Sequence, residues 1–240
     1  MYTKEQFAKL IDYTLIRPTT TRDDVLHFCS EARKHHFAAA VVLPSWVPLA
    51  VRQLDGSDVK VCTTIGFPHG ASTRSTKVYE ARNAITNGAE ELDIVINVGA
   101  LKSGDYDFVR RELSDVVSAS QISGLTTDQR RILVKVIIET PLLDREEKIT
   151  ACHLVLESGA DYVKTATGTA PGGSSLEDIH LIRTVVGPTI GVKAAGGIRT
   201  VEHAMNLLDA GVNRLGTSSG VVICDAYDPD ELLKAARQPG

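Results

Sequence analysis

The sequence lacks an apolar run of the roughly 18 residues needed to cross a bilayer. Its first residues, MYTKEQFAKLID, also lack the apolar core of a signal peptide. Basic residues are not in excess either, because the formal net charge is −4 at pH 7. Nothing in this charge favours a nucleic acid or an anionic membrane surface. We therefore expect a cytoplasmic protein that binds neither membranes nor nucleic acids.

Cysteine is scarce and scattered, and no two cysteines have the C-x-x-C spacing. Cys29, Cys62, Cys152 and Cys224 are therefore predicted to be reduced core residues, not disulfide partners or zinc ligands. The seven histidines include no H-x-x-x-H pair beside a glutamate. We expect no metal ion, so the chemistry must come from side chains alone or from a diffusible cofactor.

The chain also has no linker rich in proline, glycine or serine that would divide its 240 residues. This length suits one large α/β domain or two small ones. We predict a single domain over residues 1–240.

What the sequence does contain is an alternation of short β-branched runs with amphipathic stretches. Eight strands are predicted at 10–16, 38–43, 59–66, 91–98, 132–139, 161–165, 190–195 and 212–217. Helices are predicted between them, for example at 21–36, 76–87, 107–120 and 201–210. Three of the intervening segments end at Gly88, Gly159 and Gly211, which suit the left-handed position that ends a helix.

Eight strands alternating with helices over this length predict a (β/α)₈ TIM barrel. A doubly wound open sheet is the alternative, but no G-x-G-x-x-G follows the first strand.

Polar residues lie near the ends of several predicted strands, where barrels place their active sites. Lys164 and Lys193 take equivalent places in DYVKTATG and TIGVKAAGG. Asp93, Lys135 and Asp12 lie on other strands. A lysine whose pKa is lowered by burial or by a second cation becomes a nucleophile, so the pattern predicts imine chemistry. The alternative is that these lysines form structural ion pairs, and the residues alone do not decide which lysine would react.

Glycine-rich loops follow the last three strands, with the sequences TGTAPGG, AGGIRT and GTSSG. Barrels commonly hold phosphate in the loops after strands seven and eight. Glycines let backbone N–H groups approach the oxygens, Ser218 and Ser219 offer hydroxyls, and Arg199 offers charge. The alternative is that these glycines only form turns. The loops predict a phosphorylated carbonyl substrate.

At this point the sequence resembles the deoxyribose-phosphate aldolase family of class I aldolases. Motifs along nearly the whole chain carry the resemblance: IDYTLIRPTTT, PSWVPLA, VCTTIGFPHGASTRSTKVYEA, GAEELDIVINVGALKSGDYDFV, KVIIET, YVKTATG, GVKAAGGIRT and RLGTSSG. The resemblance implies a (β/α)₈ fold and reversible cleavage of 2-deoxy-D-ribose 5-phosphate to D-glyceraldehyde 3-phosphate and acetaldehyde, a step of deoxyribonucleoside catabolism. It further implies no cofactor, and a homodimer or homotetramer.

The resemblance also implies roles for individual residues. Lys164 falls on the lysine that forms the Schiff base, Lys193 on the lysine that lowers its pKa, and Asp93 on the carboxylate of the proton relay. Asp12 and Thr167 would complete the polar surroundings of the reacting carbons. The residues expected around the substrate phosphate are Gly168, Gly196, Gly197, Arg199, Gly216, Ser218 and Ser219.

The chain departs from the common family pattern at a few positions, which puts its substrate range in question. These positions are Tyr13, Arg17, Val41, Leu43 and Thr169. The final residues, ELLKAARQPG, also lack the tyrosine that some members carry near the phosphate.

The residues alone leave two other functions open. One is another class I barrel aldolase or a transaldolase acting on larger sugar phosphates, and the other is a catalytically silent phosphosugar-binding protein.

Arg74, Lys77 and Arg82 lie on one predicted helix. We interpret them as a solvated face and not as an anion site.

Overall fold

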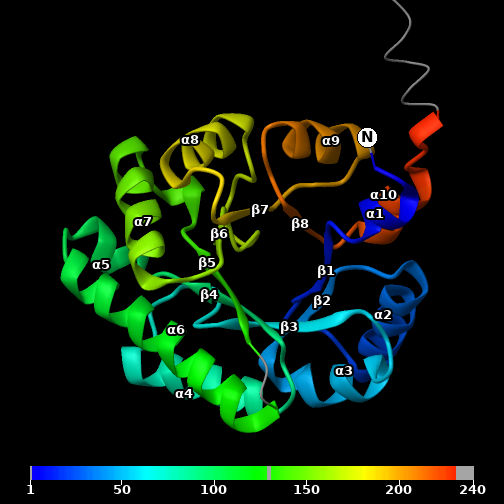
Figure 1. The fold of residues 1–240 in the computed structure, drawn as a ribbon, viewed down its shortest axis with the longest axis horizontal. Coiled ribbons are helices and arrows are strands. Elements are labelled where there is room, and N and C mark those ends of the chain that lie inside the picture. Colours follow the sequence, from blue (N-terminus) through cyan, green and yellow to red (C-terminus); the bar gives the residue numbers. More distant parts are fainter. Residues whose placement is uncertain (1, 129–130, 231–240) are drawn as a thin grey trace, which may run out of the picture.

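Eight parallel strands close into a barrel in chain order, with β1 pairing with both β2 and β8. The structure is a computed structural model that describes residues 2–128 and 131–230. Figure 1 shows the helices arranged around the strands. The predicted (β/α)₈ barrel is therefore confirmed, and the open doubly wound sheet is wrong. The C-terminal sequence ELLKAARQPG lies outside the described residues.

All eight predicted strands are present, and each is shorter than predicted at one or both ends. They are β1 (Ile11–Leu15), β2 (Ala39–Val42), β3 (Lys60–Ile65), β4 (Glu91–Val95), β5 (Leu133–Ile137), β6 (Tyr162–Lys164), β7 (Gly191–Ala195) and β8 (Arg214–Thr217).

The predicted helices are also present, together with shorter ones. The α-helices are α1 (Lys4–Ala8), α2 (Arg22–His35), α3 (Val47–Leu54), α4 (Arg74–Thr86), α5 (Val98–Lys102), α6 (Tyr106–Asp128), α7 (Arg145–Ser158), α8 (Leu176–Val186), α9 (Val201–Asp209) and α10 (Gly220–Ala226). Two 3₁₀ turns are η1 (Pro44–Trp46) and η2 (Thr140–Leu142).

Local sequence sets where the longer helices begin and end. Thr21 and Asp144 each form a capping box, in which the side chain accepts from the third backbone N–H of α2 or α7. Gly88, Gly159 and Gly211 have positive φ angles of 102°, 76° and 103° just after α4, α7 and α9. The prediction that these glycines end helices in the left-handed region is confirmed.

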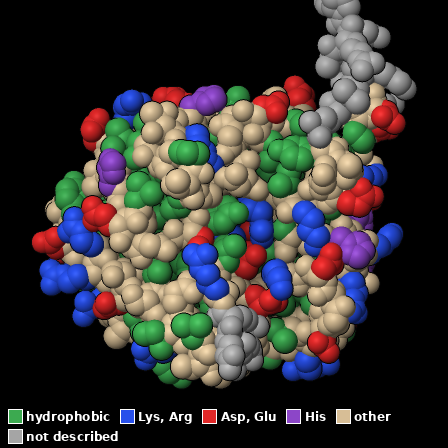
Figure 2. Space-filling view, in the orientation of Figure 1, with side chains coloured by type: hydrophobic (Ala, Val, Ile, Leu, Met, Phe, Trp, Pro, Cys, Tyr) green, Lys and Arg blue, Asp and Glu red, His purple; other side chains and the backbone are tan. Residues whose placement is uncertain are grey.

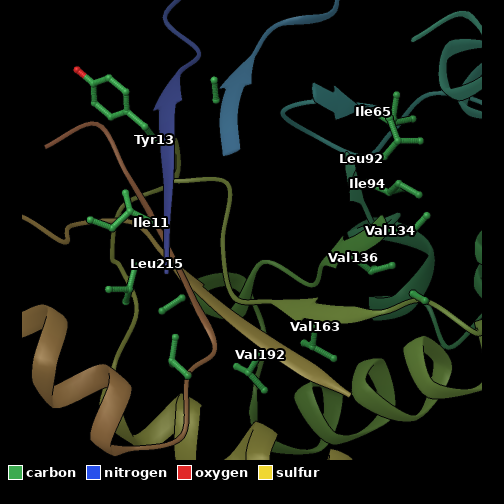
Figure 3. Close-up of a cluster of buried hydrophobic side chains, with 14 of the residues drawn as sticks. Ile11, Tyr13, Ile65, Leu92, Ile94, Val134, Val136, Val163, Val192 and Leu215 are labelled. Carbon is green, nitrogen blue, oxygen red and sulfur yellow. The ribbon is translucent and has the colours of Figure 1, made fainter. Parts of the chain in front are cut away.

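The apolar core lies between the outer face of the barrel and the helices. Figure 3 shows Val163 and Val192 pointing from their strands towards surrounding helices. Both are fully buried, as are Ile94 on β4 and Val136 on β5. Because side chains alternate along a strand, the residues between these apolar ones point into the barrel. This leaves the interior positions of the strands for polar groups.

The fourth strand is shorter than predicted. The sequence pattern places Asn97 on the strand with Asp93, but β4 ends at Val95. Asn97 instead caps α5, and its side-chain oxygen accepts a hydrogen bond of 3.0 Å from the backbone N–H of Ala100. The asparagine therefore satisfies an otherwise unpaired helix N–H and does not belong to the strand.

Lys77 is fully buried, so the predicted solvated face on α4 is wrong at this position. Its ammonium group donates to Glu112 of α6 at 2.7 Å and to the carbonyl of Val95 at 2.8 Å. Burial lowers the pKa of Lys77 and raises the pKa of Glu112, although each charge opposes the shift of the other. Arg74 and Arg82 are exposed, as expected.

The molecular surface carries charges of both signs. Figure 2 shows Lys and Arg side chains interspersed with Asp and Glu side chains, and apolar groups scattered between them. Among residues 2–128 and 131–230, no helix is both long enough and apolar enough to cross a bilayer.

Replacing Lys77 with methionine is expected to lower the free energy of unfolding by about 3–5 kcal/mol, because Glu112 then stays buried without its partner. Urea denaturation measures this. The double variant Lys77→Met/Glu112→Leu should recover much of the loss.

Lys60→Met is the matched control, because Lys60 is half exposed and pairs with Glu90 on the surface at 2.7 Å. It should cost no more than about 1 kcal/mol. Equal losses for Lys77→Met and Lys60→Met would show that burial of the first pair does not matter.

Candidate active site

The interior of the barrel holds a cluster of charged side chains. Six strands contribute them: Asp12 from β1, Glu91 and Asp93 from β4, Lys135 from β5, Lys164 from β6, Lys193 from β7 and Arg214 from β8. Strand register brings several together, because Asp93 lies beside Lys135 and Lys164 lies beside Lys193. Charges are rarely buried unless they are paired, so the contacts among these groups decide which of them stay ionised.

Asp93 is the centre of the cluster and is fully buried. Its Oδ2 atom lies 2.7 Å from Lys164 Nζ and 2.7 Å from Lys193 Nζ, and its Oδ1 atom lies 3.0 Å from Lys135 Nζ. Burial by itself would raise the pKa of Asp93, but the three ammonium groups outweigh it and hold the pKa well below its usual range. The carboxylate is therefore ionised and accepts from all three lysines.

Asp12 lies on the side of Lys193 away from Lys164. Its Oδ2 atom is 2.6 Å from Lys193 Nζ, and its Oδ1 atom accepts from Arg214 Nε at 2.7 Å. Burial would raise the pKa of Asp12, but Arg214, Lys193 and Lys135 lower it further than burial raises it. Asp12 therefore keeps Lys193 charged.

The three interior lysines have different electrostatic surroundings. Burial lowers the pKa of each, but Asp12 and Asp93 raise that of Lys193 above its usual range. Asp93 and Glu91 do the same for Lys135. For Lys164, burial and the charge of Lys193 outweigh Asp93, and the pKa is lowered. Lys164 is thus the amine that loses its proton most easily.

A cavity of about 460 Å³ lies at the carboxyl ends of the strands, bounded by β1 and by the loops after β6, β7 and β8. Lys164 lines it, and Lys135 and Lys193 are fully buried outside its lining. Thr167 also lines the cavity. The location agrees with the prediction that polar strand ends form the site. The lysine with the lowered pKa is also the interior lysine that faces the cavity.

Most residues predicted around a phosphate line the same cavity. They are Gly168, Gly196, Gly197, Arg199, Gly216 and Ser218. Ser219 is outside the lining and precedes α10, where its backbone N–H donates to Thr217 Oγ1 at 2.9 Å. The loops therefore converge beside Lys164, as the sequence pattern predicts, with Ser219 as the exception.

Two glycines in these loops have a structural requirement of their own. Gly196 has a φ of 100°, a conformation that residues with a Cβ rarely adopt. A Cβ at Gly216 would lie 3.0 Å from Cε of Lys193. Gly216 therefore leaves the space in which Lys193 extends towards Asp93.

The positions that depart from the common pattern make ordinary local contacts. The hydroxyl group of Tyr13 donates to Glu31 at 2.8 Å, and Thr169 pairs with Thr167 through their hydroxyl groups at 2.8 Å. Val41 is buried in a small apolar cluster with Ala39 and Cys62. Arg17 lines the cavity, and Leu43 precedes η1.

Two interior groups were missed by the sequence pattern, and a third group, which lies beyond its strand, was misplaced. Glu91 and Arg214 were not singled out, although each lies two residues before a predicted site residue, Asp93 and Gly216, and so shares its strand face. The strand predicted over 132–139 places Glu139 on the same face as Lys135. Glu139 instead follows β5 with a φ of 59°, and both carboxylate oxygens accept from the Thr167 backbone N–H at 3.2 Å.

Comparison with known proteins assigns the class. Residues 8–226 match the model of the DeoC/LacD family of aldolases, and the chain belongs to this family.

Several relatives within this family are named deoxyribose-phosphate aldolases. The chain is 50% identical to the deoxyribose-phosphate aldolase of Bacillus mycoides, over 90% of this chain and 93% of the relative. It is 52% identical to the deoxyribose-phosphate aldolase of Brevibacillus brevis, over 90% and 93% of the two chains. A solved structure described as a unique tetrameric deoxyribose phosphate aldolase from Aeropyrum pernix has a TM-score of 0.85 and 33% identity, covering 93% of this chain and 92% of that one.

Replacing Lys193 with methionine is expected to raise the pKa of Lys164, because a repelling cation is lost while Asp93 remains. Only the neutral amine reacts with aldehydes, so borohydride trapping of acetaldehyde should be about tenfold slower at pH 7 and recover at higher pH. The measurement is trapping rate against pH, with Lys193→Arg as the control that keeps the charge. If the trapping rate of Lys193→Met rises with pH at the same pH as in the parent, Lys193 does not lower the pKa of Lys164.

Proposed function

We propose that this chain cleaves 2-deoxy-D-ribose 5-phosphate reversibly to D-glyceraldehyde 3-phosphate and acetaldehyde, through an imine on Lys164. One observation carries the proposal: among the three interior lysines, Lys164 has the lowered pKa and faces the cavity. The names of the relatives from Bacillus mycoides and Brevibacillus brevis support the substrate and reaction.

The substrate phosphate is placed in the loops after β6, β7 and β8. The glycines at 168, 196 and 197 line the cavity beside Ser218. Arg17 and Arg199 line it too and are exposed, so they add positive charge at its mouth. A phosphate held here leaves the open-chain aldehyde directed towards Lys164 at the floor, and such remote binding orients the reacting carbons.

The reaction begins when the neutral amine of Lys164 attacks the aldehyde carbon, C1, and forms a carbinolamine. Loss of water gives a protonated imine. The C3 hydroxyl group then loses its proton, the C2–C3 bond breaks, and its electron pair moves to the imine to give an enamine, while C3 leaves as the aldehyde of glyceraldehyde 3-phosphate. Protonation of the enamine at C2 and hydrolysis by water release acetaldehyde and restore the amine.

Asp93 and Lys193 are proposed to carry the protons in these steps. Asp93 Oδ2 lies 2.7 Å from Lys164 Nζ, next to the atom on which the carbinolamine forms. The low pKa of Asp93 makes it a weak base by itself, and Lys193 Nζ donates a hydrogen bond to its Oδ2 atom at 2.7 Å. Because Lys193 is charged and can only give up a proton, the hydroxyl proton passes through a water to Asp93, and the pair returns one proton to C2 of the enamine. Asp12 acts through Lys193, and Thr167 lines the cavity beside the reacting carbons.

The chain is further proposed to act as one domain, as a homo-oligomer, in the cytoplasm. Tetrameric structure is stated for the relative from Aeropyrum pernix and supports a dimer or tetramer here. The four cysteines are free and buried, which suits a reducing compartment. Light scattering of the purified chain measures its assembly mass, and a monomer mass would contradict the oligomer.

Borohydride reduction in the presence of acetaldehyde should attach a two-carbon group to the peptide that holds Lys164. Lys164→Met should lose this adduct, and kcat/KM for the sugar phosphate should fall by at least about a thousandfold, because the covalent step is lost. Peptide mass mapping and coupled assays measure both. An adduct on Lys193 or Lys135 would reassign the nucleophile, and no adduct in folded parent protein would favour a phosphosugar-binding protein.

Arg199→Ala should lower kcat/KM for 2-deoxyribose 5-phosphate by about tenfold, the size of one lost charge-assisted hydrogen bond. The value for unphosphorylated 2-deoxyribose should not change, because the arginine is assigned to the phosphate. Steady-state kinetics with both sugars measures the ratio. Arg22→Ala, an exposed position outside the cavity lining, is the control. Equal losses for both sugars would place Arg199 in a role other than phosphate binding.

A further inference from the structure

Six of the seven interior charges form a closed ring in which cations and carboxylates alternate. The contacts run Arg214 to Asp12 at 2.6 Å, Asp12 to Lys193 at 2.6 Å, Lys193 to Asp93 at 2.7 Å, Asp93 to Lys135 at 3.0 Å, Lys135 to Glu91 at 2.6 Å, and Glu91 back to Arg214 at 3.0 Å. Each member therefore contacts at least two partners of opposite charge, and Lys135 also lies 3.5 Å from Asp12 across the ring.

The ring is electrically neutral without Lys164. It contains three carboxylates and three cations, so Lys164 is a fourth cation that shares Asp93 Oδ2 with Lys193. A buried charge without compensation is expensive, and losing one proton removes the excess. The ring cations give up a proton less easily, because each of them contacts at least two carboxylates, whereas Lys164 contacts Asp93 alone.

The other groups that face the cluster do not alter this count. Cys62 of β3 lies 3.4 Å from Asp93 Oδ1 and from Lys135 Nζ, and burial keeps its thiol protonated by raising its pKa. Burial likewise raises the pKa of Tyr162 on β6. The interior residues of β2 are apolar. Glu139, beyond β5, is held by the Thr167 backbone N–H.

We propose that Arg214 is a positioning residue that closes this ring and thereby selects Lys164 as the neutral amine. Arg214 neither lines the cavity nor contacts Lys164. Its positive charge compensates Asp12 and Glu91, so a positive charge on Lys164 is not required to balance these carboxylates. The inference rests on the proposed role of Lys164 as nucleophile.

Changing the charge balance should move the pKa of Lys164 in a direction set by the sign. Arg214→Met leaves two cations and three carboxylates in the ring, so Lys164 is held as the third cation. Glu91→Gln leaves three cations and two carboxylates, so its proton is expelled more strongly. The double variant Arg214→Met/Glu91→Gln has two of each and is balanced again.

The experiment is the rate of borohydride trapping of acetaldehyde on Lys164 as a function of pH, in the parent and these variants. The rising limb should move to higher pH in Arg214→Met, with about tenfold slower trapping at pH 7, and to lower pH in Glu91→Gln. The double variant and Arg214→Lys should return close to the parent profile. Circular dichroism and cooperative thermal unfolding establish that each variant folds.

The inference is overturned if the rising part of the rate–pH profile stays at the parent pH, or if it moves in the same direction in both single variants. Arg214 would then only pack inside the barrel. A double variant that keeps the shift of Arg214→Met would overturn the inference as well. If Arg214→Met does not fold, the double variant compared with Glu91→Gln still decides, because removing Arg214 should then move the profile back to higher pH. Absence of any adduct in the parent would instead overturn the proposed function, so the two failures are distinguishable.

Discussion

The whole structure depends on matching charges inside a closed barrel, where water does not solvate them. TIM barrels usually fill this space with branched apolar side chains. Here three carboxylates and three lysines are buried together with Arg214, whose side chain is 13% exposed, and none of the buried charges could be placed there alone without a large loss of stability. The mutual contacts of these groups make the interior tolerable. Lys164, the group at the cavity, still has a lowered pKa, because its burial and the charge of Lys193 outweigh its contact with Asp93.

Barrel closure is what brings the matched groups together. Asp12 and Arg214 are separated by 202 residues in the chain, and they meet because β1 pairs with β8. The outward residues of the same strands, such as Val163 beside Lys164, pack against helices and supply the apolar core. The six strands that carry the charged groups therefore serve stability on one face and chemistry on the other. The glycine loops after β6, β7 and β8 are proposed to bring the phosphate group of a substrate near the lysine.

The sequence was sufficient for the strands and for the positions of Lys164, Lys193 and Asp93, because alternation and the strand–loop pattern are local signals. It was insufficient for pairings between distant strands. Glu91 and Arg214 share a face with predicted residues, but nothing local shows that they contact each other across the barrel. The burial of Lys77 could not be predicted for the same reason, because its spacing on α4 fits an exposed face and its partner Glu112 lies 35 residues away. Burial of a charge depends on the partner it meets, and the partner is set by the fold.

The contact of Lys77 with the Val95 carbonyl has a consequence for recombining barrels from different parents. Lys77 of α4 contacts both Glu112 of α6 and Val95, the last residue of the strand that carries Asp93. The two helices lie side by side outside the barrel in Figure 1. A crossover point between α4 and α6 would separate the lysine from its glutamate, and a chimera would inherit one buried charge from each parent. Residues 74–128 are therefore a single exchangeable block, larger than the one-strand, one-helix unit that the repeating fold suggests.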